Sequence, residues 1–240
     1  MSSQRNKVMD EILEDLSLAI GEDERKQLIE YTNCLLEGLK RQRLTGERSA
    51  EDIINKQIYD SLYPLKFIEI CEGSKMLDLG SGGGLPGLPI KICKPGVHLY
   101  LLDSNQRKMK FLEDTARKLR LQNVYYLYGR AEVWGQDNEN REKYDIVLCK
   151  AVAETKVLAE LALPLTKVGG CVILYKGPRG RQEVDNARNA IKICGGEIDQ
   201  SWNYKLPTGE QRAIYKIKKI TKTPQEYPRE VGKPGRKPIK

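Results

Sequence analysis

The sequence is poor in the residues that build metal and disulfide sites. It has one histidine, His98, and its six cysteines are scattered without a CxxC pair or a Cys/His cluster. A zinc site needs such a cluster and a disulfide scaffold needs a regular cysteine framework, so we expect neither a metal nor disulfides. His98 stands in a strand-like run, which favours a core or edge position over a catalytic one.

Long apolar runs are also missing. No stretch approaches the roughly 20 apolar residues that a membrane-spanning helix needs, and the N-terminal residues MSSQRNKV contain no apolar signal core. The sequence therefore predicts a cytoplasmic protein with no membrane span.

The composition is that of a globular protein with an unusually basic end. The 240 residues, 40% hydrophobic and 31% charged, suffice for one large or two small domains. The net charge is +8, and residues 213–240 alone hold nine Lys/Arg against two Glu. Such an end suggests a phosphate backbone or an acidic membrane surface as partner, although it can also serve only solubility.

The most informative stretch is residues 75–89, KMLDLGSGGGLPGLP. Its apolar start fits a buried strand, five glycines follow within residues 80–87, and Pro86 favours a first helical turn. Glycine lets a ligand approach the backbone closely, and a helix N-terminus offers unpaired N–H groups. We therefore interpret this loop as a nucleotide-type binding site, the alternative being a tight turn without a ligand.

Two adenosine cofactors fit this loop. The dinucleotide pattern GxGxxG is met formally at Gly82, Gly84 and Gly87, but its register after the strand is poor. The pattern Asp78-x-Gly80-x-Gly82 fits S-adenosylmethionine better, since an acidic residue closing the first strand would face the cationic methionine end. Asp103 closes the next apolar run, where a carboxylate can accept the ribose hydroxyls of either cofactor.

Residues 8–63 show helical periodicity. Ser49 followed by Asp52 resembles a helix cap, and Pro64 closes the segment. The cationic link at residues 40–45 can equally meet RNA or be solvated.

From residue 75 onward, apolar runs begin near 76, 98, 124, 145 and 171 and alternate with helical patterns such as 105–119 and 181–194. This alternation predicts βαβ units and a doubly wound, mostly parallel sheet. The runs 197–204 and 212–220 flank Pro207-Thr208-Gly209 and predict an antiparallel edge hairpin. The Pro-rich tail, 221–240, is expected to be extended or partly disordered.

In such a sheet the ligand lies at the carboxyl ends of the strands. The third strand end offers Ala131 and Glu132 to an adenine, and four strand ends supply cations that suit phosphates. The fourth strand has no Asn/Asp-Pro-Pro-aromatic motif and no cysteine pair is placed for a covalent adduct, which leaves an acceptor that is already nucleophilic. The four cations are Arg130, Lys150, Lys176 and Arg212.

Several motifs together resemble the bacterial RsmG (GidB) family of 16S ribosomal RNA guanine-N7 methyltransferases. The likeness covers nearly the whole chain, and GLPGLP after the glycine loop is its most specific element. The other motifs are LLDSNQRKMKFL, Lys150-Ala151, Leu174-Tyr175-Lys176-Gly177, Gly209-Glu210-Gln211-Arg212, Leu44-Thr45, Asp60-Ser61-Leu62 and a TPxxYPRxxGxPxxxPI-like tail at 223–239.

The resemblance implies a class I S-adenosylmethionine-dependent methyltransferase, with a Rossmann-like seven-stranded sheet (67–220), an N-terminal helical extension (1–66) and a basic tail (221–240). It implies methyl transfer to N7 of a guanine in the 530 loop of 16S rRNA, with S-adenosylhomocysteine as product and the small subunit or its precursor as partner. The protein is expected to be a monomer. The implied cofactor contacts are Asp78, Gly80, Gly82, Leu85, Asp103, Ala131, Glu132 and Lys150; the implied RNA contacts are Lys108, Arg130, Lys150, Lys176 and Arg212, of which Lys150, Lys176 and Arg212 are expected at the reacting base.

The sequence departs from the family at two places. The family usually has Arg at the position of Lys150 and commonly has His at the position of Gln57. Lysine lacks the bidentate fork of arginine. Guanine N7 keeps an in-plane lone pair, so a general base is unnecessary and transfer would rest mainly on placing the reactants together. An NAD(P)-dependent oxidoreductase and a non-catalytic RNA-binding module are the alternatives.

Overall fold

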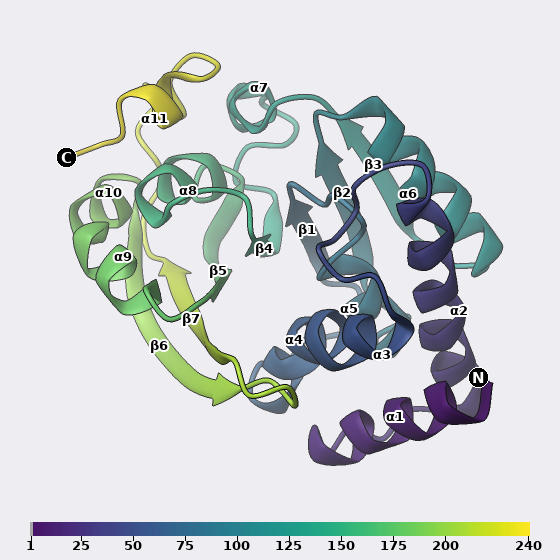
Figure 1. Cartoon of the computed structure of the whole chain (residues 1–240). Helices are drawn as coiled ribbons and strands as arrows, with labels where there is room; N and C mark the ends of the chain where they lie inside the picture. Colours follow the sequence, from purple (N-terminus) through teal and green to yellow (C-terminus); the bar gives the residue numbers. More distant parts are fainter. Residues whose placement is uncertain (1) are drawn as a thin grey trace.

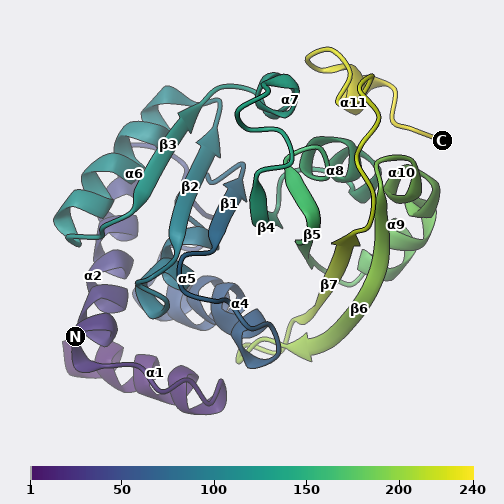
Figure 2. The same ribbon diagram turned by 180° about the vertical axis from the view of Figure 1, so that it is seen from behind.

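A computed structural model describes residues 2–240 and shows a seven-stranded sheet between two layers of helices (Figure 1). The strand order is β3-β2-β1-β4-β5-β7-β6. The first five strands are parallel, and β7 and β6 form an antiparallel pair at one edge, opposite β3 (Figure 2). The strands are β1 (Lys75–Leu79), β2 (His98–Asp103), β3 (Val124–Tyr128), β4 (Tyr144–Lys150), β5 (Thr166–Lys176), β6 (Gly196–Lys205) and β7 (Gln211–Lys219).

The prediction of a doubly wound sheet with an edge hairpin is therefore confirmed. Four of the five parallel strands begin within one residue of the predicted starts, and β5 begins earlier, at Thr166. Adjacent residues of β1 point to opposite faces: Met76 packs in the core cluster under the N-terminal helices, and Leu77 packs in the cluster on the other side. Burial on both faces is what a parallel sheet requires.

The N-terminal residues are helical, as predicted, although the first helix begins at Ser2 rather than near residue 8. The side chain of Ser49 accepts a hydrogen bond from the Asp52 backbone N–H at 3.0 Å, so the predicted cap is present. Pro64 does not end the segment, because it lies inside a 3-10 turn. The elements are α1 (Ser2–Asp15), α2 (Glu22–Leu39), α3 (Ala50–Asp52), a π-helical stretch (Ile53–Ile58), α4 (Tyr59–Leu62) and the 3-10 turn (Tyr63–Lys66).

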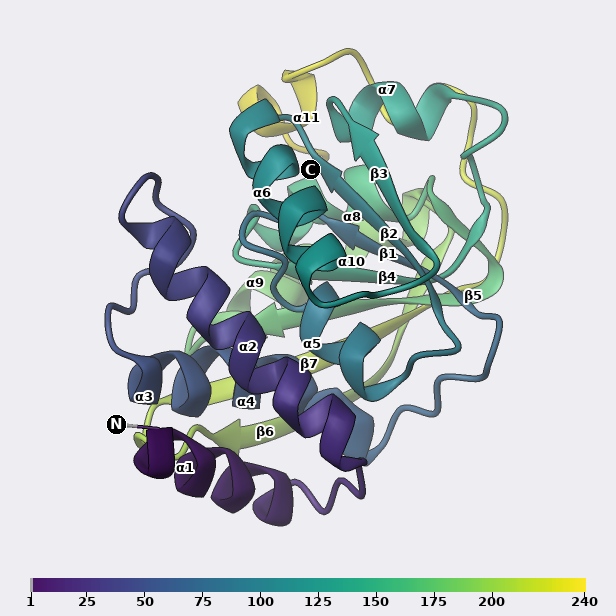
Figure 3. The same cartoon turned by 90° about the vertical axis from the view of Figure 1, so that its right-hand side faces the viewer.

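The remaining helices cover the two faces of the sheet. With α2, the helices α5 (Gly87–Cys93) and α6 (Gln106–Lys118) lie on one face (Figure 3), and α8 (Thr155–Ala162), α9 (Gly180–Asn186) and α10 (Arg188–Ile193) lie on the other. The single helix expected at 181–194 is broken at Ala187, which no sequence feature marks. Pro86 precedes α5 instead of occupying its first turn.

The C-terminal tail differs from the expectation, because it folds back onto the sheet domain beside α7 (Ala131–Gln136) and α8 and includes the short helix α11 (Lys233–Arg236) (Figure 1). The guanidinium of Arg141 donates to the backbone oxygens of Thr223, Pro224 and Tyr227. Arg229 forms a two-pronged ion pair with the fully buried Glu160, at 2.6 and 2.8 Å. These partners satisfy charged and polar groups that would otherwise be buried alone.

None of the helices in residues 2–240 is both long enough and apolar enough to cross a membrane.

Candidate active site

A cavity of about 470 Å³ opens at the carboxyl ends of β1, β2 and β3. Its walls come from three strand ends, from the loop after β4 and from the C-terminal tail. The walls include Leu79, Gly80, Asp103, Ser104, Gly129, Arg130, Ala131, Glu132, Val152, Ala153, Gly232, Gly235 and Arg236. The predicted cofactor residues Gly80, Asp103, Ala131 and Glu132 thus share one cavity, whereas Asp78, Gly82, Leu85 and Lys150 do not line it.

The glycine loop beside this cavity has a backbone that other residues rarely adopt. Gly80, Gly82 and Gly84 have φ values of +74°, +55° and +92°, and this left-handed region favours glycine. A Cβ at Gly80 would also lie 2.7 Å from the side chain of Val152. From beneath the loop, the buried Tyr31 hydroxyl of α2 donates to the Gly83 carbonyl at 2.8 Å, so the N-terminal extension helps to fix the loop.

Asp78 lies near the end of β1 and is almost completely buried, with 1% of its surface exposed. Its Oδ2 accepts a hydrogen bond from the Gly87 N–H at 3.0 Å, and a Cβ at Gly87 would collide with this oxygen. Its Oδ1 has no partner among the described residues. Burial raises the pKa of Asp78 to about 7, against the opposing effects of the Gly87 hydrogen bond and the Lys150 charge. The site thus holds a buried carboxyl group with only one hydrogen-bonded oxygen, so its negative charge is incompletely compensated.

Asp103 closes β2 at the cavity wall. Its Oδ2 accepts from the Gly82 N–H at 2.9 Å, and its Oδ1 accepts from the Asn105 N–H at 2.8 Å. These two bonds orient the carboxylate toward the glycine loop. A carboxylate has about four lone-pair positions, so Asp103 can still accept hydroxyl donors from a ligand.

Glu132 is the third acidic group of the site and is 4% exposed. Its Oε1 accepts from the Gly232 N–H at 2.8 Å and from Arg130 at 3.4 Å, while its Oε2 is buried without a partner in the described chain. Sequence reasoning missed the tail residues 232–236 at this position. The only sequence signal for these residues was the family motif in the tail, and the resemblance assigned no role to that motif.

Lys150 lies in a nearly buried network away from the cavity, with 11% of its side chain exposed. Its Nζ is 2.9 Å from Oδ2 of Asp60, whose other oxygen accepts from the Tyr204 hydroxyl. The Gln57 carbonyl lies 3.4 Å from the same Nζ. Asp60 on α4 and Tyr204 on β6 are thus functional candidates. The sequence analysis named Asp60 only as part of a family motif, without a role, and did not single out Tyr204.

The other predicted cations do not gather into one free cluster. Lys176 is 8% exposed and pairs with Glu183 at 2.8 Å, whereas the side chain of Arg130 is 52% exposed at the cavity wall. Arg212 lies on β7. Burial and the charge of Asp60 raise the pKa of Tyr204, and the positive charge of Arg212 opposes this shift. Lys108 lies in the first turn of α6.

The residues present fit an S-adenosyl cofactor. Asp78 Oδ1 and Glu132 Oε2 are buried acceptors with no donor in residues 2–240, and such atoms are costly unless a ligand, water or proton satisfies them. An S-adenosyl compound offers cationic groups, an amine and two ribose hydroxyls, which match Asp78, Glu132 and Asp103 in kind. Across the same residues, no three His, Cys, Asp or Glu side chains group as metal ligands.

Curated proteins of similar sequence share one description. A family model described as GidB, rRNA small subunit methyltransferase G, matches residues 24–220. The proteins called ribosomal RNA small subunit methyltransferase G from Pelotomaculum thermopropionicum and Alkaliphilus oremlandii are 39% and 40% identical to this chain. The first alignment covers 94% of this chain and 95% of the relative, and the second covers 97% and 98%.

Solved structures of low identity share the fold. The TYW2 protein of M. jannaschii, solved in complex with AdoMet, has a TM-score of 0.55 at 14% identity, over 76% of this chain and 80% of that one. The fibrillarin pre-rRNA processing protein of Methanococcus jannaschii has a TM-score of 0.54 at 16% identity, over 70% and 76%.

These matches disfavour the oxidoreductase alternative, and the fold is that of class I S-adenosylmethionine-dependent methyltransferases. With a family model that matches residues 24–220 and relatives aligned over nearly their full length, the chain belongs to the GidB family of small-subunit ribosomal RNA methyltransferases.

Proposed function

We propose that the protein transfers a methyl group from S-adenosylmethionine to N7 of a guanine in the 530 loop of 16S rRNA, in the cytoplasm and as a monomer. The observation that carries the proposal is the buried, incompletely partnered carboxyl of Asp78 beneath the glycine loop. Family membership supports small-subunit rRNA as the substrate. The resemblance of the motifs supports the guanine and its N7 atom.

The cofactor, when bound, supplies an electrophilic methyl group on a sulfonium centre. Asp78 would oppose the positive charge of the cofactor, Asp103 would accept the ribose hydroxyls, and Glu132 would hold the adenine end. Gly80, Gly82 and Leu85 would shape the loop, and the backbone of Ala131 would line the adenine side. We propose no metal role.

Guanine N7 needs no deprotonation, so no residue has to act as a general base. The cavity walls in the described part of the chain contain no His, Cys or Tyr, which agrees with a reaction that depends on orientation. His98 instead lies at the far end of β2, with Nδ1 3.2 Å from the Tyr125 hydroxyl.

For the RNA we propose two roles. Lys108, Arg130 and Arg212 are partly or largely exposed and can contact phosphates directly. Lys150 and Lys176 form ion pairs with Asp60 and Glu183. We propose that each lysine acts at the reacting base indirectly, by fixing the position of its acidic partner. Lys150 would also influence the cofactor side through its charge near Asp78.

The test is to map 7-methylguanosine in 16S rRNA by borohydride reduction and aniline cleavage, in cells with and without this gene. We expect cleavage at one guanine of the 530 loop, absent after deletion and restored by the wild-type gene. Restoration by a chain carrying Asp78→Asn, or cleavage that persists without the gene, would contradict the proposal.

A further inference from the structure

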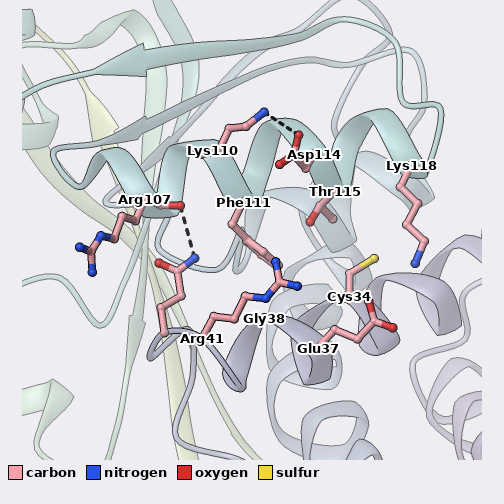
Figure 4. Close-up of a pocket in the computed structure, with 11 residues that line it drawn as sticks. Cys34, Glu37, Gly38, Arg41, Arg107, Lys110, Phe111, Asp114, Thr115 and Lys118 are labelled. Carbon is pink, nitrogen blue, oxygen red and sulfur yellow. Dashed lines mark hydrogen bonds and ion pairs between the residues drawn. The ribbon is translucent and has the colours of Figure 1, made fainter.

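A groove runs along α6, beside the cofactor cavity. It lies between α6, the chain just after α2 and the edge strand β3, and has a volume of about 660 Å³. We call it the α6 groove, and it is lined by Arg41, Gln42, Gln106, Arg107, Met109, Lys110, Glu113, Tyr126 and Tyr128. A smaller pocket of about 310 Å³ between α2 and α6 adjoins it and shares Arg41, Gln42, Arg107 and Lys110 with it (Figure 4).

Two arginines of the α6 groove have no carboxylate partner. Lys110 pairs with Asp114 at 2.8 Å, but in the described chain no ion pair holds Arg41 or Arg107. Both are exposed and also line the small pocket, where Figure 4 shows the Arg107 side chain pointing outward and the Arg41 side chain directed toward Phe111. Their charges are therefore available to an anionic ligand.

Arg107 also stands where helix stability disfavours a cation. It lies in the first turn of α6, which contains no acidic residue, and Asn105 caps this helix by accepting from the N–H groups of Arg107 and Lys108. The N-terminal end of a helix carries partial positive charge, which stabilises acids there and opposes bases. A ligand phosphate at this helix end would interact favourably both with the Arg107 charge and with the partial positive charge of the helix.

The part of the α6 groove that β3 contributes is aromatic. Tyr128 ends the edge strand β3 and is 57% exposed, and Tyr126, two residues earlier, faces the same side of the strand. Unpaired RNA bases stack on such exposed rings, whereas duplex RNA presents no free base face. Arginines and tyrosines that line the same groove therefore favour single-stranded RNA over a purely electrostatic partner.

The α6 groove and the cofactor cavity share no lining residue, but their linings adjoin each other along the chain. Arg107 shortly follows the cavity residues Asp103 and Ser104, and Tyr128 directly precedes the cavity residues Gly129 and Arg130. The link after α2 also reaches the glycine loop, because a Cβ at Gly83 would lie 3.2 Å from Leu44. A strand of RNA in the groove would thus enter the site beside the cofactor.

We propose that the α6 groove binds the single-stranded RNA next to the target base, with phosphates on Arg41 and Arg107 and a base stacked on Tyr128. This inference rests on the proposed function for the identity of the RNA. It adds a surface for substrate binding that lies apart from the residues proposed at the reacting base.

The test uses the full chain and two fluorescein-labelled RNAs. One is a 16S rRNA fragment that contains the 530 loop. The other is an oligouridine of about 15 nucleotides, which contains no guanine and is within the size of a single-strand binding site. The variants are Arg41→Ala/Arg107→Ala and Tyr128→Ala. The control, Arg188→Ala/Lys192→Ala, removes two exposed cations from α10 on the opposite face of the sheet. Anisotropy gives Kd as a function of salt, and calorimetry gives the affinity for S-adenosylhomocysteine.

We expect both groove variants to bind each RNA about tenfold more weakly, as loss of a stacked base or of two phosphate contacts predicts. The arginine pair should also flatten the salt slope by about 1.4. KM for the RNA should rise with kcat nearly unchanged, and cofactor affinity should stay the same. The α10 control should bind like the wild type.

Groove variants that bind both RNAs as tightly as the wild type would overturn the inference, as would an equal loss in the α10 control. A wild type that binds oligouridine through the groove but methylates no 530-loop guanine would contradict the proposed function and still support the groove as a binding site for single-stranded RNA. A wild type that binds neither RNA would overturn the groove inference, whereas the proposed function is tested separately by methylation of 16S rRNA in cells.

Discussion

Replacing Asp78 by Asn is expected to abolish methyl transfer and to stabilise the free protein. The substitution keeps the shape of the side chain and removes the charge that would face the cationic cofactor. We expect Kd for S-adenosylmethionine to rise by about 100-fold at pH 8, the scale of about 3 kcal/mol for losing a charged partner in a buried site. Calorimetry measures this affinity directly.

The gain in stability follows from the raised pKa of Asp78. The folded carboxyl titrates at about 7 and the unfolded one at about 3.8. Between these values the folded state holds a proton that the unfolded state has released, so stability falls as pH rises through this window. Above pH 7 the buried charge costs about 4 kcal/mol. Asp78→Asn should therefore raise Tm by several degrees at pH 8 and change it little at pH 4.

Cofactor binding should show the reverse dependence on pH, because the bound state favours ionised Asp78. The affinity of the wild type should increase about tenfold between pH 6 and pH 8, with a proton released on binding. The Asp78→Asn variant retains any titration that belongs to the ligand, so it is the matched control and should lack the Asp78 step. Equal affinity of both proteins at pH 8 would refute the role of Asp78.

The second large effect is expected for Lys150→Met. This substitution leaves Asp60, whose side chain is 6% exposed, with the Tyr204 hydroxyl as its remaining close partner in the described chain. Removing one member of a buried ion pair costs roughly 3–5 kcal/mol, so Tm should fall by about 10 °C. The Lys150 charge also lowers the pKa of Asp78. Its loss should move the pH midpoint of cofactor binding upward.

A pair of further variants separates these two consequences of Lys150→Met. Lys150→Arg keeps the charge and should retain methyl transfer and the pH midpoint. Lys150→Met/Asp60→Asn removes both charges, so it should recover much of the lost stability but keep the raised midpoint. Thermal melts and calorimetry across pH measure the two quantities. A midpoint that returns to the wild-type value in the double variant would show that Lys150 acts only through stability.

Local patterns in the sequence predict the fold well. The strand starts, the Ser49 cap and the edge hairpin depend on residues that are near neighbours in the chain, and all but the start of β5 lie close to where they were predicted. The glycine loop likewise carries its own signal, since Gly80 and Gly82 take positive φ values. These features need no knowledge of distant residues.

The partners of the site residues could not be predicted in the same way. Tyr204 meets Asp60 across 144 positions of the chain, and Glu132 meets the Gly232 N–H across 100 positions. Whether a strand-end lysine such as Lys150 is free or paired depends on which distant side chain the fold brings to it. The tail was expected to be extended or partly disordered because its composition is polar. Its fold depends on distant contacts such as the ion pair between Arg229 and the buried Glu160, which the local sequence does not reveal.

The most direct measurement is a crystal structure of the protein grown with S-adenosylhomocysteine. We expect the nucleoside to lie between Asp103, Glu132 and residues 232–236, with the amino-acid end directed toward Asp78. A nucleoside bound elsewhere on the molecule, or a tail that fills this cavity and excludes the ligand at saturating concentration, would contradict it.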